Sequence, residues 1–185
     1  NLDYIKVAKK PIVFWNKEEI EKFLFMNKDE HYFNLYLFAL NTGLRKGEIC
    51  GLCWDSVDFK EQKIIIQRNM TRYGLNEQTK SKKSRMVYLN ETALSILQNL
   101  KSKNISSQFV FTSQKGEAVD YEHLTERHFK QAIKRAGVRS IKFHNLRSSF
   151  ASNYVMSGGN IFDLSKILGH YSVGITENCY ANLNG

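Results

Sequence analysis

The sequence predicts a mainly α-helical domain that carries one small, three-stranded antiparallel β-sheet. Apolar residues recur three and four positions apart through most of the chain, which is the period of an amphipathic helix. Between Trp54 and Leu89 the pattern changes to short runs rich in β-branched residues, separated by polar turns, which is typical of strands. With 185 residues and 42% hydrophobic content the chain can bury one core, so we expect one domain.

The first third of the chain predicts a linker and then helices. Residues 1–13 are basic and irregular, and we interpret them as a linker from an absent upstream part, with the domain covering residues 14–185. Asn16 is an N-cap for a first helix, and a strongly apolar second helix runs from about Glu30 to Leu40. Gly43 suits the left-handed turn that ends a helix, which places Arg45 at the start of the next one.

The middle of the chain predicts the sheet. Three short runs have strand composition, and polar turns around Lys60–Gln62 and Tyr73–Asn76 connect them. We therefore expect three antiparallel strands: Val57–Phe59, Lys63–Gln67 and Arg85–Leu89.

Helices return in the second half of the chain. Asn90 caps a helix through Asn99, and Tyr121–Ala136 has Leu124, Phe129 and Ile133 on its apolar side. A helix that begins within Phe143–Arg147 has an apolar stripe of Leu146, Phe150 and Tyr154 and ends at Gly158-Gly159. His144, Arg147 and Ser148 lie away from this stripe, on the wet side of the helix. The last predicted helices are Asn160–Leu168, broken at Gly169, and one from about Ile175 that carries Tyr180.

Charge and cysteine content limit the function classes. The formal net charge is +9, and residues 61–150 hold 17 Lys and Arg against 7 Asp and Glu, which favours a polyanionic partner. Three cysteines are too few for a disulfide framework, and we interpret Cys50 and Cys53 as core residues of a helix from Glu48 to Trp54, without metal. No apolar run approaches the roughly 18 residues of a membrane span, and no secretory leader is present. Because the chain starts with Asn, we expect a fragment.

Five separate motifs occur in order along the chain. Residues 42–48 read T-G-L-R-K-G-E, residues 80–85 read K-S-K-K-S-R, and His144 and Arg147 lie three residues apart. Leu168-Gly169-His170 follows, and Tyr180 comes ten residues after His170. In order and spacing these motifs resemble the tyrosine recombinase (phage integrase) family from about Phe14 to Tyr180, nearly the whole chain. The resemblance implies the tyrosine recombinase catalytic-domain fold.

The resemblance, together with the chemistry of the side chains, assigns six catalytic positions. Tyr180 is the expected nucleophile, because a phenol with a pKa near 10 ionises far more readily than an alkyl hydroxyl. Arg45 and Arg147 offer planar forks to the two non-bridging oxygens of a phosphate, with Glu48 orienting Arg45. His144 accepts the tyrosine proton or holds a phosphate oxygen, and the resemblance implies that His170 hydrogen-bonds the phosphate.

The remaining roles concern the leaving group and the DNA backbone. Lys80 is the position that matches the catalytic lysine of the family, and it would protonate the departing 5′ oxygen. We expect phosphate contacts from other cations of the basic middle region: Lys82, Lys83, Arg85, Arg127 and Lys130. The sequence has no G-x-x-x-x-G-K-[ST] loop and no obvious carboxylate cluster, so we expect neither a cofactor nor a metal.

The resulting interpretation is the catalytic domain of a site-specific recombinase or integrase of a phage or mobile element. The family resemblance implies double-stranded DNA as partner, four protomers acting on two duplexes, and a cytoplasmic, nucleoid-associated location. A type IB topoisomerase is the nearest alternative, although His144 and the residues before Tyr180 depart from its pattern. A non-catalytic DNA-binding regulator and a metal-dependent nuclease are further alternatives, and the presence of all six positions argues against the regulator.

Overall fold

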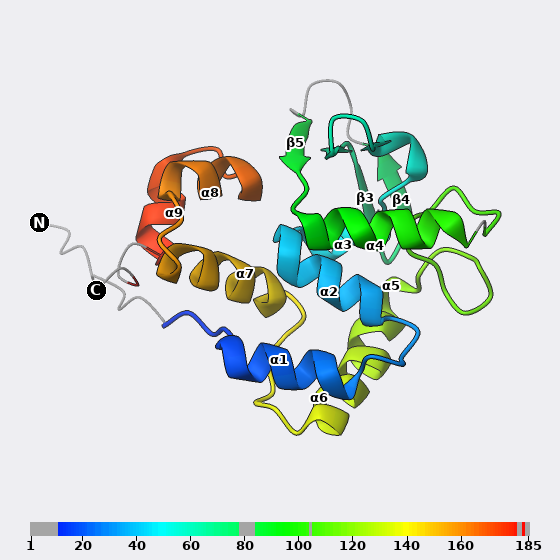
Figure 1. Ribbon diagram of the computed structural model, residues 1–185, viewed down its shortest axis with the longest axis horizontal. Helices are drawn as coiled ribbons and strands as arrows, with labels where there is room; N and C mark the ends of the chain where they lie inside the picture. The colour runs from blue at the N-terminus through cyan, green and yellow to red at the C-terminus, as the bar shows by residue number, and fades with distance from the viewer. Residues whose placement is uncertain (1–10, 78–83, 104, 181–182, 184–185) are drawn as a thin grey trace, which may run out of the picture.

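The computed structural model describes residues 11–77, 84–103, 105–180 and 183 (Figure 1). The described part is mainly helical, as predicted. Its α-helices are α1 (Lys17–Met26), α2 (Phe33–Thr42), α3 (Lys46–Cys50), α4 (Glu91–Ser102), α5 (Tyr121–His123), α6 (Lys130–Ala136), α7 (Asn145–Met156), α8 (Ile161–Leu168) and α9 (Val173–Tyr180). A 3₁₀ turn, η1, covers Trp54–Ser56, and a π-helical segment, η2 (Leu124–Phe129), joins α5 to α6 as one continuous rod over the predicted Tyr121–Ala136.

The predicted three-stranded antiparallel sheet is confirmed. Strands β1 (Val57–Asp58), β2 (Lys63–Ile66) and β5 (Arg85–Tyr88) pair in the order β1-β2-β5, with Ile64 opposite Val87 and Ile66 opposite Arg85. The structure adds a hairpin that was not predicted, formed by β3 (Arg68–Thr71) and β4 (Gly74–Glu77) in the stretch expected to be a turn. This hairpin packs against α3 and so supports the helix that follows Arg45.

Local signals explain where the helices begin and end. Asn16 caps α1 in a reciprocal box with Glu19, in which each side chain accepts a hydrogen bond from the other residue's backbone N–H. Gly43 ends α2 in the left-handed conformation with φ of 64°, and a Cβ there would approach the Phe150 ring to 2.4 Å. The α2 terminus is therefore held directly against α7.

Two apolar cores meet at α7. The larger one surrounds α2 and includes an aromatic cluster in which the Trp15 and Phe23 rings are 4.7 Å apart and the Phe129 and Phe143 rings 5.2 Å apart. The smaller core lies among α7, α8 and α9 and consists of Ala151, Val155, Leu164, Leu168 and Tyr180. Figure 1 shows these three helices grouped at one side of the molecule, so α7 links the two cores.

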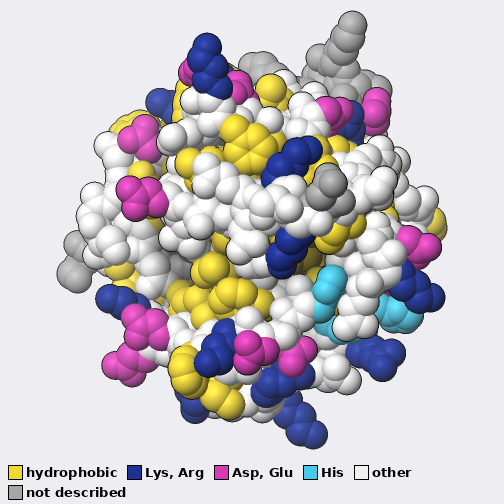
Figure 2. All heavy atoms as spheres, turned by 45° about the vertical axis from the view of Figure 1, so that its right-hand side comes forward, with side chains coloured by type: hydrophobic (Ala, Val, Ile, Leu, Met, Phe, Trp, Pro, Cys, Tyr) yellow, Lys and Arg dark blue, Asp and Glu magenta, His cyan; other side chains and the backbone are white. Residues whose placement is uncertain are grey.

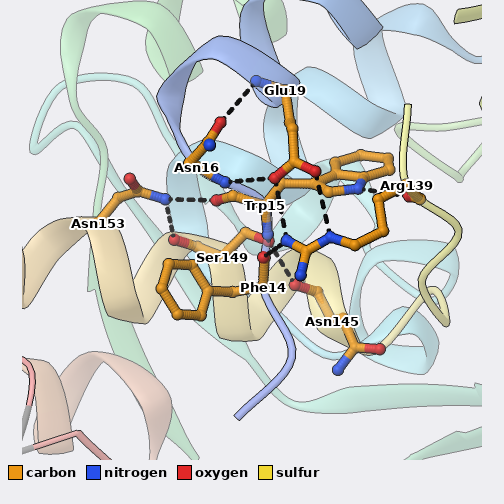
Figure 3. A network of polar contacts seen from close by, with 8 residues as sticks. All are labelled: Phe14, Trp15, Asn16, Glu19, Arg139, Asn145, Ser149 and Asn153. Carbon is orange, nitrogen blue, oxygen red and sulfur yellow. Dashed lines mark hydrogen bonds and ion pairs between the residues drawn. The ribbon is translucent and has the colours of Figure 1, made fainter. Parts of the chain in front are cut away.

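A polar network fixes the incoming chain on α7 (Figure 3). The Trp15 N–H donates to Ser149 Oγ at 2.9 Å, and Asn153 Nδ2 donates to the Trp15 carbonyl at 3.1 Å. The Trp15 indole N–H donates to the Arg139 carbonyl at 2.7 Å, while the Arg139 guanidinium pairs with Glu19. The segment that enters the domain is thus bonded to the helix that carries Arg147.

Two expectations about local structure are wrong. The helix predicted from Glu48 to Trp54 ends at Cys50, and Cys53 instead forms an isolated β-bridge with Phe109. The second correction concerns α7: Arg147 and Ser148 are buried rather than on a wet face, because backbone carbonyls take the place of water around the guanidinium.

The described residues contain no helix long and apolar enough to cross a membrane. On the face shown in Figure 2, Lys and Arg side chains are interspersed with Asp and Glu side chains around exposed apolar patches. That face does not present a continuous cationic surface.

Candidate active site

Arg45 lies at the N-terminus of α3, where the sequence predicted it. It is the N-cap residue, and its backbone N–H donates to Glu48 Oε2 at 2.8 Å. Its guanidinium Nη1 donates to Glu48 Oε1 at 3.0 Å, the contact through which Glu48 was expected to orient Arg45. The Arg45 side chain remains 47% exposed. Part of its fork is therefore open to an anion next to a helix N-terminus, where the dipole also favours negative charge.

Glu48 is a buried carboxylate that two guanidinium groups share. Only 3% of Glu48 is exposed, and both of its oxygens accept hydrogen bonds from Arg85, at 2.7 and 2.8 Å. Burial acts to raise the pKa of Glu48, but the hydrogen bonds and charges of Arg85 and Arg45 outweigh it, and the pKa falls below its usual range. Glu48 is thus ionised and keeps the two arginines close together despite their like charge.

Arg147 is the buried centre of the site. Its Nη1 donates to the Gly43 carbonyl at 2.8 Å and its Nη2 to the Leu168 carbonyl at 2.7 Å, so it joins the ends of α2 and α8. Burial and the nearby positive charge of Arg45 lower the pKa of Arg147 to about 10, which leaves it protonated at neutral pH. The bonds to the two carbonyls fix the fork and leave its Nε–H edge for a further acceptor.

His170 lies in the turn after α8 and contacts Arg147. Its Nε2 is 3.3 Å from Arg147 Nη2, and its Nδ1 is 2.7 Å from the hydroxyl of Thr176. Because a guanidinium only donates, Nε2 accepts and the proton lies on Nδ1, which donates to Thr176. Burial and the charges of Arg147, Arg45 and Arg85 lower the pKa of His170 to about 4. His170 is therefore neutral at pH 7.

Tyr180 ends α9 and packs into the smaller core, with 7% of its surface exposed. Its phenol hydrogen-bonds with Ser148, the residue after Arg147. Burial raises the pKa of Tyr180, while the Ser148 hydrogen bond and the Arg147 charge partly offset that rise. The phenol is thus protonated at neutral pH and lies beside the buried guanidinium.

His144 lies at the N-terminus of α7 and is exposed. Partial burial and the charges of Arg147 and Arg45 lower the pKa of His144, so the imidazole is mainly neutral at pH 7. His144 and Arg45 line the same cleft, which has a volume of about 950 Å³. The walls of the cleft also carry the amines of Lys46, Lys130 and Lys142.

The remaining predicted residues are the cations that were expected to act on the leaving group or the DNA backbone. Lys80, Lys82 and Lys83 fall outside the described residues. Arg127 and Lys130 are exposed, as predicted, and Lys130 pairs with Glu126. Arg85, expected at a DNA surface, is directed inward at Glu48.

Sequence reasoning missed two partners of the predicted residues, Thr176 and Ser148, and two lysines that line the cleft, Lys46 and Lys142. Thr176 lies one helical turn before Tyr180, a spacing that offers a weak signal. Ser148 follows Arg147 directly, but the helical period placed it on the wet face. Lys46, directly after Arg45, binds the Thr125 hydroxyl at 2.8 Å and lies over the Tyr121 ring.

The arrangement is suited to bind an anion with side-chain cations. The guanidinium groups of Arg45 and Arg85 bind one carboxylate, that of Glu48, whose charge also acts on the guanidinium of Arg147. A neutral imidazole, from His170, and a phenol, from Tyr180, adjoin Arg147. Among the residues that the structure describes, no group of three His, Cys, Asp or Glu side chains is placed to hold a metal ion.

The helical architecture with its small sheet defines the fold of a tyrosine recombinase catalytic domain. A model of the phage integrase family matches residues 14–185, and the chain belongs to this family. Among curated relatives, a XerC-like tyrosine recombinase of Caldanaerobacter subterraneus subsp. tengcongensis is 28% identical over 91% of this chain and 50% of its own length. The transposase of transposon Tn916 from Enterococcus faecalis is 31% identical over 93% of this chain and 48% of its own length. The chain thus spans about half the length of these relatives.

Solved structures agree on the fold. The catalytic domain of bacteriophage HP1 integrase is 27% identical and superposes with a TM-score of 0.67, covering 93% of this chain and 88% of that chain. The Tn1549 transposon integrase, solved in complex with a circular intermediate DNA, is 22% identical with a TM-score of 0.81, covering 96% of this chain and 64% of that chain.

Proposed function

We propose that this chain is the catalytic domain of a site-specific recombinase that cuts and rejoins double-stranded DNA through a 3′-phosphotyrosyl intermediate. The observation that carries the proposal is the convergence of three residues that are separate in the sequence: Arg147 on α7, His170 in the turn after α8, and Tyr180 on α9. Family membership and the DNA-bound Tn1549 integrase support DNA as the substrate. Similarity to the Tn916 transposase supports integration or excision of a phage or mobile element.

In the proposed reaction, the Tyr180 oxygen attacks the scissile phosphorus as the phenol loses its proton. A bond forms between the phenolic oxygen and phosphorus, and the bond from phosphorus to the 5′ oxygen breaks. Neutral His144 takes the phenolic proton, and Lys80 gives a proton to the departing 5′ oxygen. One phosphodiester replaces another of similar energy, so rejoining is the reverse reaction and needs neither ATP nor a metal.

Arg45 and Arg147 stabilise the charge that develops on the non-bridging oxygens. Their forks are fixed before substrate arrives, so little reorganisation is required at the moment of reaction. Loss of one such donor typically costs about 3–4 kcal/mol of transition-state stabilisation, or roughly 10²–10³ in rate. His170 accepts from Arg147, so we propose that it orients Arg147 and bonds the phosphate when its ring turns or gains a proton.

The cleft beside Arg45 and His144 is the proposed path of the DNA backbone. Lys46, Lys130 and Lys142 line it, and cations along a cleft are the usual source of affinity for phosphates. We also assign backbone contacts to Arg127, Lys82 and Lys83.

Other properties of the whole protein are proposals that rest on the family. We propose that residues 1–13 link the domain to an upstream DNA-binding part, that four protomers assemble on two duplexes, and that the protein acts on DNA in the cytoplasm at the nucleoid. A type IB topoisomerase-like strand transferase or a non-catalytic regulator of the same fold would share the architecture.

A covalent-trapping experiment tests the mechanism. The full-length protein is incubated with nicked duplexes taken from candidate attachment sites, in the presence of EDTA, and the products are separated under denaturing conditions. We expect a covalent protein–DNA band that disappears in Tyr180→Phe but persists in Tyr154→Phe, which alters another tyrosine packed on the same small core. Cleavage that EDTA abolishes would indicate a metal-dependent nuclease, and binding without any covalent band would indicate a regulator.

A further inference from the structure

Arg85 begins β5 and makes its hydrogen bonds inside the protein. Its Nη1 and Nη2 donate to the two oxygens of Glu48 at 2.7 and 2.8 Å, and its Nε donates to the Ile167 carbonyl at 3.0 Å. The side chain is 16% exposed. Arg85 therefore joins the sheet to the start of α3 and to the end of α8.

The bidentate pair between Arg85 and Glu48 limits how Arg45 binds the same carboxylate. An ionised carboxylate accepts about four hydrogen bonds, and Arg85 supplies two of them. The Arg45 backbone N–H supplies one, and a single guanidinium N–H of Arg45 supplies the fourth. Without Arg85, the buried carboxylate of Glu48 would have Arg45 as its remaining cationic partner and would draw the whole fork inward. With Arg85 present, most of the Arg45 fork stays available.

Arg85 also determines the shape of the turn before His170. Gly169 has φ of +67°, and a Cβ at this position would lie 2.5 Å from Arg85 Cδ and 2.8 Å from Arg85 Nε. The arginine side chain thus rests directly on the glycine, which needs both the left-handed conformation and the absence of a side chain. The next residue is His170, so the path of the turn depends on Arg85.

We propose that Arg85 is a positioning residue that fixes the positions of Arg45 and His170 relative to each other. It holds Arg45 through Glu48, and it holds His170 through Ile167 and Gly169. The catalytic consequence rests on the proposed function, because Arg45 and His170 act on phosphate only in that reaction. Direct contact of Arg85 with DNA, as the sequence predicts, is the competing explanation.

The first test compares Arg85→Lys with Arg68→Lys in the full-length protein. Arg68 is a matched control on β3, because it has the same 16% exposure and makes a bidentate pair with Asp55 at 2.6 and 2.8 Å. We expect Arg85→Lys to slow single-turnover formation of the covalent complex by tenfold to a hundredfold. DNA affinity and its salt dependence should change by less than threefold, and Arg68→Lys should alter neither quantity. A loss of affinity with an unchanged cleavage rate of bound DNA would overturn the proposal in favour of direct contact.

The second test probes the positions of Arg45 and His170 in the absence of DNA, so it does not depend on catalytic activity. Proton–nitrogen correlation spectra are recorded for the Arg45 Nε–H and the His170 ring in the unmodified protein, Arg85→Lys and Arg68→Lys. We expect the Arg45 and the His170 signals to shift in Arg85→Lys and to remain unchanged in Arg68→Lys. Unchanged Arg45 and His170 signals would overturn the proposal even if cleavage were slow.

The failure of this inference can be distinguished from the failure of the proposed function. If the unmodified protein forms no covalent complex, the proposed function fails, while the spectra still decide whether Arg85 positions the two residues. If Arg85→Lys does not fold, Glu48→Gln supplies the same comparison, because it weakens the bridge from the other side. Slower covalent-complex formation and shifted Arg45 and His170 signals in Glu48→Gln would support the bridge, and an unchanged rate with unchanged signals would contradict it.

Discussion

Replacing Thr176 by valine would remove one hydroxyl from the space between the turn at His170 and helix α9. Thr176 is fully buried, and its hydroxyl is 2.7 Å from His170 Nδ1. Valine has almost the same shape, so the substitution leaves the packing of α9 intact and deletes the acceptor. The Nδ1–H of His170 then has no partner, or the proton moves to Nε2.

Both consequences cost free energy. A buried donor without an acceptor costs about 1–3 kcal/mol. A proton on Nε2 would face the Arg147 Nη2 donor, which is 3.3 Å away, so two donors would oppose each other. We therefore expect Thr176→Val to lower the free energy of unfolding by about 2 kcal/mol and to slow covalent-complex formation at least tenfold, since tenfold corresponds to about 1.4 kcal/mol.

Denaturant unfolding and nitrogen chemical shifts of the His170 ring measure the two effects. Thr42→Val is the matched control: Thr42 is equally buried, but its hydroxyl donates to the Phe38 carbonyl of its own helix at 2.7 Å, and we expect a cost below about 1 kcal/mol. An unfolding free energy within about 0.5 kcal/mol of the parent, together with a proton that remains on Nδ1, would refute the assignment of the His170 tautomer.

Three further predictions follow from the same structure. The pKa of His170 is lowered from 6.5 to about 4, so its neutral form stabilises the fold above pH 6.5, and this contribution is lost as the pH falls toward 4. After a discount for the partial exposure of the ring, we expect the contribution to be about 1–2 kcal/mol. The free energy of unfolding of His170→Gln should therefore change less with pH than that of the unmodified protein. Asn153→Ala removes the bond to the Trp15 carbonyl, and we expect a loss of about 1–2 kcal/mol in denaturant unfolding, whereas an unchanged midpoint would contradict an anchoring role. Gly43→Ala meets both a left-handed φ and the Phe150 ring at 2.4 Å, so thermal unfolding should show a loss above about 2 kcal/mol, and a neutral result would contradict the close approach of α2 to α7.

The sequence predicted the parts of the fold that local chemistry decides. Asn16 and Gly43 marked helix ends because caps satisfy backbone groups within a few residues. The hairpin of β3 and β4 was missed because its composition carries no apolar alternation: Met70 is its buried residue. An ion pair from Arg68 to Asp55 and packing on α3 hold the hairpin, and a local pattern contains neither contact.

The site was predictable as a set of residues and less so as a geometry. The spacing of the motifs singled out Arg45, Arg147, His170 and Tyr180 as candidates, but the helical period placed Arg147 on a wet face. The helical period assigns residues to faces on the assumption that charged side chains face water. Here the carbonyls of Gly43 and Leu168 solvate the guanidinium instead, and both come from helix ends distant in the sequence.

Arg85 illustrates the same limit. In a basic run, an arginine five residues after Lys80 is expected to meet DNA. Whether such an arginine faces outward depends on a buried acid 37 positions earlier, and Glu48 is that acid. The sequence contains both residues, but no local pattern in it indicates that Arg85 and Glu48 form an ion pair.

The charges of the site match the proposed reaction. Arg45, Arg85 and Arg147 carry three positive charges against one negative charge on Glu48, while His170 and Tyr180 are neutral at pH 7. A phosphodiester carries one negative charge, and attack by a phenolate brings a second, so the transition state is a dianion. The two uncompensated positive charges equal that dianion rather than the singly charged substrate, and a preorganised field that fits the transition state better than the ground state accelerates the chemical step.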